Sequence, residues 1–461
     1  MSIDPDLIKS LREREERLFE ELHPRSAELS AGAEDDLLSA VPMNWMTRWP
    51  GRFPIYFSSA AGAEVSDVDG INYVDLCLGD TGAMCGHSPP AAVAAIAAQA
   101  ARGITTMMPS ADAGAVGALM GARFGLNHWQ FTVSATDANR FVVRLCRQVT
   151  ERPKILVFNH CYHGSVDETV VTLADDGRAI PRYGSVGPPV DPALTTRVVE
   201  FNDVAALERE LSHGDVACVL AEPALTNIGI VLPDLGFHDE LRRICTETGT
   251  LLVIDETHTL SCGPGGYSAA HGLEPDAMTM GKPIAGGIPT GAYGLSDELA
   301  ARVLKRTAWD AADVGGVGGT LAGNALQLAA VRATLGEVLT AEAYERMIGL
   351  AGRYEAGVNE AIARHDLGWS AIRLGCRVEY MFSPEPPCDG GAAAEVIGGP
   401  LDELMHLYML NRGILFTPFH MMALMSPATT TEHVDRHTAA FDAISSELAG
   451  SRTDPIPEPA G

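Results

Sequence analysis

Residues 216–256 read VACVLAEPALTNIGIVLPDLGFHDELRRICTETGTLLVIDE. Two short apolar runs, VACVLAEP (216–223) and LLVIDE (251–256), enclose a segment with helical spacing (239–249) that ends at Gly249. Continuous apolar runs of this length are typical of strands covered on both faces, as in a parallel sheet. A glycine after the last helical residue is a common helix stop. The stretch therefore predicts a strand–helix–strand unit whose ligand site lies at the carboxyl ends of its strands.

The same alternation continues toward the N-terminus. KILVF (154–158) has the pattern of another buried strand, and DVAALERELS (203–212) has helical spacing. Strands that alternate with helices over roughly 200 residues are typical of an α/β domain with a mostly parallel sheet. We therefore expect a large α/β domain over residues 61–327.

The two ends of the chain have a different character. Residues 1–60 begin with a charged segment whose apolar positions form one helical face, and the rest of this region is expected to lie on the substrate side. From residue 328 a long alanine-rich helical stretch is followed by a mixed stretch, another helix and the apolar run ILFTPF. This pattern predicts a smaller α+β domain over residues 328–450. The proline-rich residues 451–461 are expected to form a flexible tail.

Composition excludes several classes of function. The formal net charge of −27 argues against nucleic acid and anionic membranes as partners, because both favour basic surfaces. No apolar run reaches the roughly 18 residues of a transmembrane helix, and the N-terminus lacks the apolar core of a signal peptide. The nine cysteines are scattered singly, which favours a reducing cytoplasm over a disulfide framework or a metal site. We expect a cytoplasmic protein without a bound metal.

One lysine stands out. Residues 278–287 read MTMGKPIAGG, which sets Lys282 between glycines in a chain with only four lysines. A buried lysine amine can form a Schiff base with an aldehyde, which the guanidinium of arginine cannot do. Asp255 ends an apolar strand, where by itself it could equally be a helix cap or a turn residue. A strand-end carboxylate that faces a pyridinium nitrogen, together with a lysine Schiff base, is how proteins hold pyridoxal phosphate.

Three further segments are compatible with this cofactor, although each has a simpler reading. FTVSATDAN (131–139) predicts a strand and a helix start whose free N–H groups would bind a phosphate, or only a helix cap. NHCYHGS (159–165) places Tyr162 after a strand, where its ring could stack on a flat cofactor or pack in the core. GGVGGTLAGN (315–324) is a glycine-rich loop that carries Thr320.

In these motifs and their order the chain resembles the class III aminotransferases, which are fold-type I pyridoxal-phosphate enzymes. The likeness covers roughly residues 40–445 and is densest over 216–294, and it is nearest to glutamate-1-semialdehyde aminomutase and its transaminase relatives. It implies a large domain with a mostly parallel seven-stranded sheet flanked by helices, and a smaller α+β C-terminal domain.

The resemblance also implies roles for individual residues. Lys282 corresponds to the Schiff-base lysine that acts as acid and base, and Asp255 to the carboxylate on the pyridine nitrogen. The other implied cofactor contacts are Ala135 and Thr136 at the phosphate, Tyr162 stacked on the ring, Glu222, Asn227 near the 3′-hydroxyl, Thr257 under the ring, and Thr320. Since Thr320 corresponds to a threonine that reaches the phosphate of the neighbouring subunit, a homodimer is implied.

The chain departs from the family's pattern on the substrate side. His420 lies near the position of an aminomutase glutamate, and the aminomutase's tryptophan near Thr81 is missing. Arg48 is our candidate for binding a substrate carboxylate, because the aminomutase has such an arginine after a similar asparagine. Arg52 is nearly as good a candidate, and two further arginines, Arg373 and Arg377, remain alternatives.

The sequence favours an aminotransferase that moves an amino group between a small amino acid or amine and a keto acid or aldehyde by a ping-pong mechanism. An aminomutase of the glutamate-1-semialdehyde type is the alternative, and the changed residue at His420 counts against it. An ammonia-lyase that acts on an amino-alcohol would use the same residues. A non-catalytic member of the family is disfavoured by the intact pair of Asp255 and Lys282.

Overall fold

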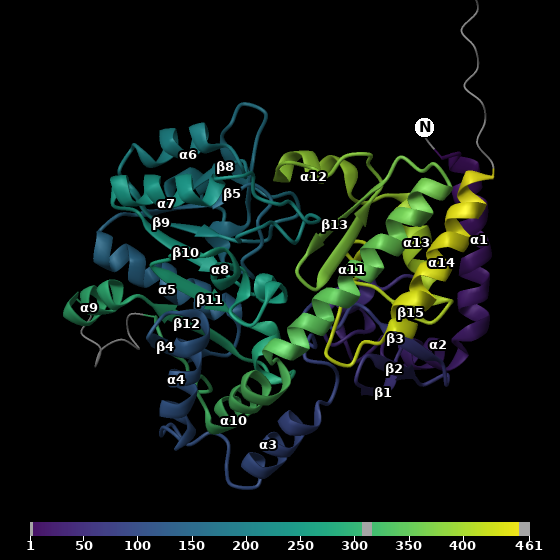
Figure 1. Cartoon of the computed structure of the whole chain (residues 1–461), viewed down its shortest axis with the longest axis horizontal. Coiled ribbons are helices and arrows are strands. Elements are labelled where there is room, and N and C mark those ends of the chain that lie inside the picture. The colour runs from purple at the N-terminus through teal and green to yellow at the C-terminus, as the bar shows by residue number, and fades with distance from the viewer. Residues whose placement is uncertain (1–2, 307–315, 451–461) are drawn as a thin grey trace, which may run out of the picture. The chain divides into compact units, whose positions relative to one another are not determined.

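The computed structural model describes residues 3–306 and 316–450 of the chain (Figure 1). These residues form two compact units. The central unit comprises residues 81–346 and 387–395, and the terminal unit comprises residues 3–80, 347–386 and 396–450.

The central unit is built on a seven-stranded sheet. Its strands run in the order β4 (His128–Thr132), β12 (Gly291–Leu295), β11 (Ala277–Met280), β10 (Leu251–Asp255), β9 (Val216–Ala221), β5 (Lys154–Phe158) and β8 (Thr196–Val199). Only β12 is antiparallel to its neighbours. The expected strands over 154–158, 216–223 and 251–256 are present as β5, β9 and β10, and the mostly parallel seven-stranded sheet is confirmed.

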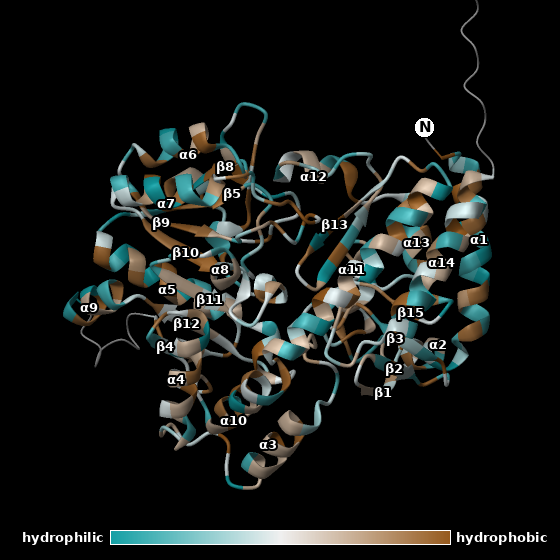
Figure 2. Ribbon diagram, viewed as in Figure 1, coloured by the Kyte–Doolittle hydropathy of each residue, from teal (hydrophilic) through white to brown (hydrophobic). Residues whose placement is uncertain are grey.

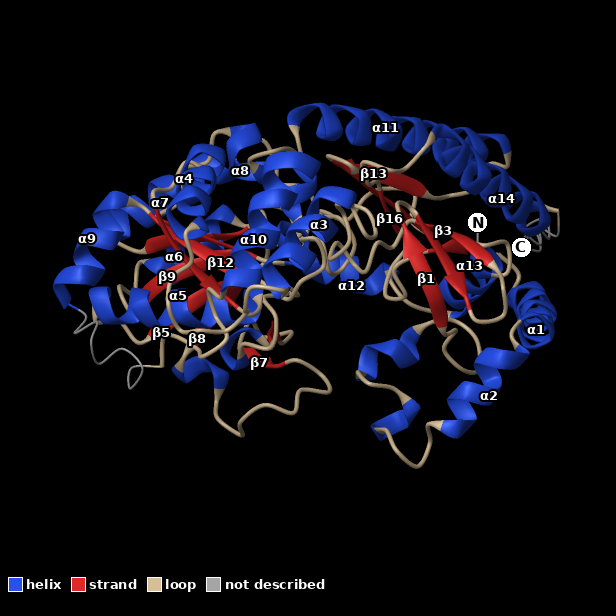
Figure 3. Cartoon of the chain, turned by 90° about the horizontal axis from the view of Figure 1, so that it is seen from below, coloured by secondary structure: helices blue, strands red, loops and turns tan. Residues whose placement is uncertain are grey.

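Helices flank this sheet in the α/β manner (Figure 3). The helices of the central unit are α3 (Pro90–Ala100), α4 (Asp112–Phe124), α5 (Ala135–Thr150), α6 (Val204–Leu211), α7 (Phe237–Thr248), α8 (Gly266–His271), α9 (Asp297–Arg306), α10 (Ala325–Ala333) and α12 (Gly390–Val396). The crossover through α5 runs toward the β8 edge, whereas those through α6 and α7 run toward the β4 edge. Right-handed crossovers in opposite directions place their helices on opposite faces of a sheet.

Burial on both faces explains why these strands are apolar throughout. Every residue of β9 and β10 is buried, and Figure 2 colours these strands as hydrophobic. Helix α7 ends where the sequence predicts, with Gly249 at φ +64° as its cap. Polar side chains are thereby confined to the strand ends and the loops that follow them.

The terminal unit contains two small sheets. One has the order β1 (Phe57–Ala61), β2 (Glu64–Asp67), β3 (Asn72–Asp75) and β15 (Ile414–Leu415), and the other has the order β13 (Ser370–Leu374), β14 (Arg377–Met381) and β16 (Met422–Leu424). Its helices are α1 (Pro5–Leu22), α2 (Pro24–Gly32), α13 (Pro400–Leu410), α14 (Thr431–Ala449) and the part of α11 (Ala341–Arg364) from residue 347 onward. Helices α11 and α14 lie side by side, joined by the ion pair of Arg353 and Asp435 (Figure 3).

The two units divide the chain differently from the expected lobes. Residues 1–80 do not form a separate segment but fold with the C-terminal part of the chain. The reason is pairing between distant residues: β15 pairs with β3 in parallel, and α1 packs along α13. The expected tail, residues 451–461, lies outside the described residues.

Glu15 links α1 to the C-terminal part of the terminal unit. Its side chain is fully buried and accepts hydrogen bonds from Arg412 Nη1 at 3.0 Å, Asn411 Nδ2 at 2.9 Å and Arg14 Nη2 at 2.7 Å. Burial by itself raises the pKa of Glu15, but these hydrogen bonds outweigh burial and lower it.

We expect Glu15→Gln to lower the free energy of unfolding by about 2 kcal/mol at neutral pH, since it weakens charge-assisted hydrogen bonds. Because the folded pKa lies below the unfolded value of about 4.3, this contribution is complete above that pH and is lost as the pH falls below it. Denaturant unfolding of both proteins between neutral pH and about pH 3 checks this. A difference that stays constant down to the acid end would contradict it.

Among the described residues, no helix is long and apolar enough to cross a membrane. Within the same part of the chain, no group of three or more His, Cys, Asp or Glu side chains is arranged to hold a metal ion.

Candidate active site

Asp255 lies at the carboxyl end of β10, the middle strand of the central sheet, and is only 4 % exposed. Its Oδ2 accepts hydrogen bonds from Asn139 Nδ2 at 2.8 Å and from His163 Nδ1 at 2.9 Å. Its Oδ1 accepts a hydrogen bond from the backbone N–H of Thr257 at 3.0 Å. Three donors therefore fix the orientation of this carboxylate.

The charge of Asp255 follows from these contacts. Burial by itself raises its pKa, but the hydrogen bonds from His163, Thr257 and Asn139 outweigh burial and lower it. Burial also opposes the charged form of His163, whereas its interactions with Cys161 and Asp255 raise the pKa of His163 well above its ordinary value. The carboxylate of Asp255 and the ring of His163 thus form a buried pair. The negative charge at the strand end suits a protonated ring nitrogen.

The N-terminus of α5 provides an anion site beside Asp255. Ser134 caps this helix, because its hydroxyl accepts a hydrogen bond from the N–H of Asp137 at 3.2 Å. The N–H groups of Ala135 and Thr136 lie in the first turn, where helix geometry provides no intrahelical acceptor. Such N–H groups, together with the positive end of the helix dipole, bind phosphate.

Two glycines bring other backbone segments close to this helix start. A Cβ added to Gly281 would lie 2.9 Å from the Cβ of Ala135, and one added to Gly164 would lie 2.0 Å from Oγ1 of Thr136. Gly164 also has φ +75°, in the left-handed region that favours glycine. The backbone can therefore close around the helix start only because both residues lack a side chain.

Gly164→Ala should weaken cofactor retention and lower stability by about 1–3 kcal/mol, because the new methyl group collides with Thr136 and the backbone is strained. Gly177→Ala is the matched control: Gly177 has φ +77°, but a Cβ there meets open space. Thermal unfolding and the cofactor content after gel filtration measure both effects. Equal losses in the two variants would show that backbone strain alone, and not the close approach to Thr136, is responsible.

Lys282 follows β11 at the same edge of the sheet as Asp255. Strands β10 and β11 are parallel with Asp255 opposite Thr279, so Lys282 leaves the sheet just beyond Asp255. Its φ of +51° lies in the left-handed region, which is strained for a residue with a side chain. The amine Nζ contacts Nε2 of His258, which is 4 % exposed.

A chain of polar contacts leads from His258 to the end of β9. The Nδ1 atom of His258 lies 2.9 Å from Oγ1 of Thr226, and this hydroxyl lies 2.6 Å from Oε2 of Glu222. Glu222 also accepts hydrogen bonds from the backbone N–H of Tyr162 at 3.0 Å and from Asn227 Nδ2 at 3.3 Å. Burial raises the pKa of Glu222 above its ordinary value. Lys282, His258, Thr226 and Glu222 thus form one continuous network.

These residues fit pyridoxal phosphate. The helix start at Ala135 and Thr136 matches its phosphate, the carboxylate of Asp255 matches its ring nitrogen, and the amine of Lys282 matches its aldehyde. The backbone at Gly164 and Gly281 lies close to the start of α5, where the phosphate would bind. A side chain on either glycine would collide with Thr136 or Ala135. The three sites come from a helix start, a strand end and a loop that the central sheet brings to one edge.

The predicted cofactor residues all belong to the central unit. Ala135, Thr136, Tyr162, Glu222, Asn227, Asp255, Thr257 and Lys282 lie at strand ends, at the start of α5, or in the loops between them. The Oγ1 of Thr257 is buried and has no hydrogen-bond partner among the described residues. Thr320 is exposed in the turn that precedes α10.

The sequence interpretation did not single out Asn139, His163, Thr226 and His258 as functional residues. All four stand inside stretches that carried the resemblance: Asn139 in FTVSATDAN, His163 in YHG, and Thr226 and His258 within residues 216–294. The sequence could have indicated them only as polar residues among apolar neighbours in the chain. Glu222 lies only 4 residues from Thr226, but most of their other partners lie 24 to 140 residues away in the chain, so these contacts could not be read from local spacing.

The candidate substrate residues lie in the terminal unit. His420 is 4 % exposed, and its Nδ1 is 3.2 Å from Oε1 of the buried Glu379. The guanidinium carbon of Arg48 lies 5.8 Å from the ring centre of Phe419, beside a cavity of about 590 Å³. Arg48 forms no ion pair with any described residue, whereas Arg52 is paired with Glu20 at 2.8 Å.

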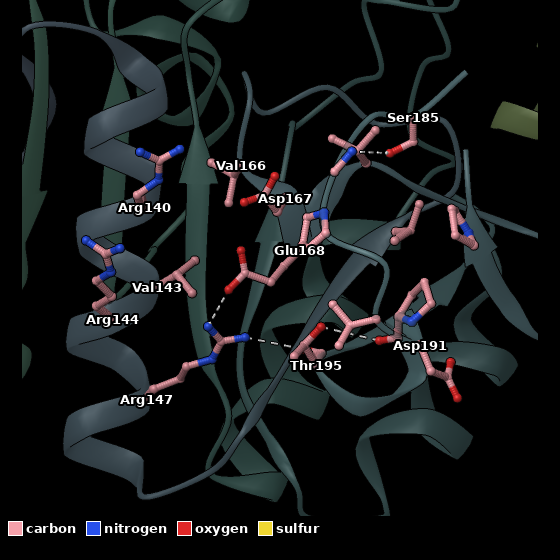
Figure 4. A pocket seen from close by; sticks show the side chains of 17 residues that line it. Arg140, Val143, Arg144, Arg147, Val166, Asp167, Glu168, Ser185, Asp191 and Thr195 are labelled. Atoms are coloured by element: carbon pink, nitrogen blue, oxygen red, sulfur yellow. Dashed lines mark hydrogen bonds and ion pairs between the residues drawn. The ribbon is translucent and has the colours of Figure 1, made fainter. Parts of the chain in front are cut away.

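A separate cavity of about 290 Å³ lies against the outer side of α5 (Figure 4). Arg140, Arg144 and Arg147 line it from the helix, and Glu168 from the loop opposite forms an ion pair with Arg147 at 2.7 Å. None of the predicted site residues lines this cavity. It is therefore distinct from the network around Lys282.

Comparison with known proteins extends these observations. Residues 45–444 match the family model for class III aminotransferases. The glutamate-1-semialdehyde 2,1-aminomutase 2 of Lysinibacillus sphaericus (strain C3-41) is 31 % identical over 407 residues, which cover 86 % of this chain and 91 % of that protein.

Solved structures agree with this match. The chain is similar to a glutamate-1-semialdehyde-aminomutase from Pseudomonas aeruginosa PAO1, with 50 % identity, a TM-score of 0.95, and coverage of 97 % of this chain and 100 % of that one. A lysine-to-alanine form of the Pseudomonas protein has been solved in complex with PMP. A β-phenylalanine aminotransferase from Variovorax paradoxus is 26 % identical, with a TM-score of 0.84 and coverage of 95 % and 97 %. The chain belongs to the class III aminotransferase family.

Proposed function

We propose that this protein is an aminomutase of the glutamate-1-semialdehyde type, which moves an amino group between neighbouring carbons of one small substrate. The observation that carries the proposal is the likeness, at 30–32 % identity over most of the chain, to glutamate-1-semialdehyde 2,1-aminomutases, and the pair of Lys282 and Asp255 supports the chemistry that such an enzyme needs. The sequence alone favoured transfer between two molecules, because His420 and the region near Thr81 depart from the aminomutase pattern.

The cofactor is pyridoxal 5′-phosphate, which supplies an electron sink for the carbon that loses its proton. The N–H groups of Ala135 and Thr136 would hold its phosphate, and the carboxylate of Asp255 would keep its ring nitrogen protonated. Lys282 would hold its aldehyde, and the amine of Lys282 would move the substrate proton. The ring of Tyr162 would lie against the cofactor, and Asn227 would bind its 3′-hydroxyl. In a homodimer, Thr320 would reach the phosphate site of the neighbouring subunit.

Arg48 is proposed to bind the substrate carboxylate, because its guanidinium has no ionic partner among the described residues. Arg48→Ala should raise KM by about tenfold or more while changing kcat less, since a charge-assisted hydrogen bond contributes about 1.5–3 kcal/mol. Arg52→Ala is the control, because Arg52 is already paired with Glu20. An unchanged KM for Arg48→Ala would assign carboxylate recognition to another residue.

An aminotransferase is the second candidate. It is supported by the structural likeness at 26 % identity to the Variovorax aminotransferase and to an ω-transaminase from Sphaerobacter thermophilus. These enzymes share the fold and the cofactor site, so the substrate side decides between the two reactions.

The test is to mix the purified protein with glutamate-1-semialdehyde and, separately, with a panel of amines and α- and β-amino acids. An aminomutase should give the rearranged amine without any added carbonyl acceptor. An aminotransferase should instead convert the visible band of the cofactor to the aminated form, and restoring the band should require a keto acid or aldehyde. Rearrangement with no acceptor supports the proposal; acceptor-dependent restoration overturns it in favour of the second candidate.

A further inference from the structure

His258 contacts the reactive lysine directly. Its Nε2 is against Nζ of Lys282, and its other ring nitrogen, Nδ1, lies 2.9 Å from the hydroxyl of Thr226. The hydroxyl of Thr226 lies 2.6 Å from Oε2 of Glu222. His258, Thr226 and Glu222 are 4 %, 0 % and 4 % exposed, so water does not compete for these contacts.

The direction of the hydrogen bonds follows from the partners of Glu222. Both of its oxygens face donors: the N–H of Tyr162 on one and the amide of Asn227 on the other. Thr226 has a single hydroxyl hydrogen, which it donates to this carboxylate. The oxygen of Thr226 is then an acceptor, so Nδ1 of His258 must carry the ring hydrogen. The lone pair of Nε2 is thereby directed at Lys282.

We propose that His258 is a positioning residue for the Lys282 amine, and that Thr226 and Glu222 hold it in the tautomer whose Nε2 accepts a hydrogen from that amine. This rests on the proposed role of Lys282 as the base that removes the substrate proton. With one of its hydrogens held by His258, the flexible lysine side chain loses orientations in which its amine points away from the substrate.

The charged groups around His258 support a fixed tautomer. Glu222 is the acid at the far end of the network. Asp255, three residues before His258 in the chain, has its oxygens turned to His163, Asn139 and the N–H of Thr257. The hydrogen of Nδ1 is directed to the hydroxyl of Thr226, which lies 2.9 Å away.

The first test reads the tautomer without turnover. Long-range ¹H–¹⁵N spectra of the holoenzyme with ¹⁵N-labelled histidine, assigned by difference from His258→Gln, should show hydrogen on Nδ1 and none on Nε2. Thr226→Val, which keeps the shape but removes the hydroxyl, should abolish this signature, and Thr226→Ser should restore it. Hydrogen on Nε2 in the wild type, or no change in Thr226→Val, would overturn the proposal.

The second test separates positioning from a merely structural role. His258→Leu is expected to lower kcat by about 10²-fold and to increase the primary deuterium isotope effect, with little change in KM. His258→Gln, whose amide oxygen can still accept a hydrogen, should regain part of the loss. His238→Gln is the control, because His238 is a half-buried histidine whose ring lies near Tyr267 instead. If kcat and the isotope effect of His258→Leu stay at their wild-type values, the proposal is wrong.

The two readouts distinguish this inference from the proposed function. If the substrate panel shows an aminotransferase, or another reaction of the same cofactor, the spectra still report whether Thr226 sets the tautomer of His258. If the tautomer is as expected and rearrangement of glutamate-1-semialdehyde is absent, only the assignment of the reaction fails.

Discussion

Lys282→Ala is expected to abolish turnover, with a loss of about 10⁴-fold or more, because both the covalent attachment and the acid–base group disappear. The fold should survive, since Lys282 is a half-buried residue at the start of a short 3₁₀-helix (Lys282–Ala285), in a strained backbone conformation, and adds no side chain to the core. The phosphate site and Asp255 remain in this variant, so the cofactor should still bind without a covalent link. The lysine-to-alanine form of the Pseudomonas protein was solved with PMP bound, which fits this expectation.

The measurement combines single-turnover rates with mass spectrometry after borohydride reduction, which fixes a Schiff base to its lysine. The wild type should carry the cofactor on Lys282, and the variant should carry none. Lys305→Ala is the control, because Lys305 is exposed on α9. A variant that keeps turnover within tenfold of the wild type would remove Lys282 from the mechanism.

Asp255→Ala is expected to have the largest effect on stability of any single change at the site. It removes the acceptor for His163 and Asn139 in a buried position, and breaking a buried ion pair costs about 3–5 kcal/mol. Cofactor affinity should fall as well, because no negative charge remains to face the ring nitrogen. Asp255→Asn keeps the size of the side chain but removes the charge, so it should restore part of the stability and little of the activity.

Unfolding at acid pH tests whether folding lowers the pKa of Asp255. Since its folded pKa is lowered, its contribution to stability is present above the unfolded value of about 3.9 and is lost as the pH falls below it. Urea unfolding at neutral pH and at about pH 3 should therefore show a smaller difference between the wild type and Asp255→Asn at the acid end. Asp176→Ala serves as the control, because this carboxylate is exposed and, among the described residues, pairs only with Arg178. Equal stability of wild type and Asp255→Ala at neutral pH would contradict the buried ion pair.

The division into units shows what local patterns miss. The predicted boundaries at residues 61 and 328 followed changes in composition, which report on nearby residues only. The pairing of β3 with β15 joins residues 72–75 to residues 414–415. No periodicity in either segment marks the other as its partner, so the sequence interpretation placed the N-terminal region in a segment of its own.

The sequence by itself determined the strand–helix alternation of the central sheet and the positions of Asp255 and Lys282. Apolar runs of strand length are stable only when both faces of the strand are buried. Lys282 could be recognised without knowing its contacts, because it is one of four lysines in the chain and stands between glycines. Only the tertiary structure determined which side chains contact Asp255 and Lys282. His163, Thr226 and His258 become functional through contacts across the ends of different strands. Because the parallel sheet gathers those ends at one edge, residues far apart in the chain become neighbours there.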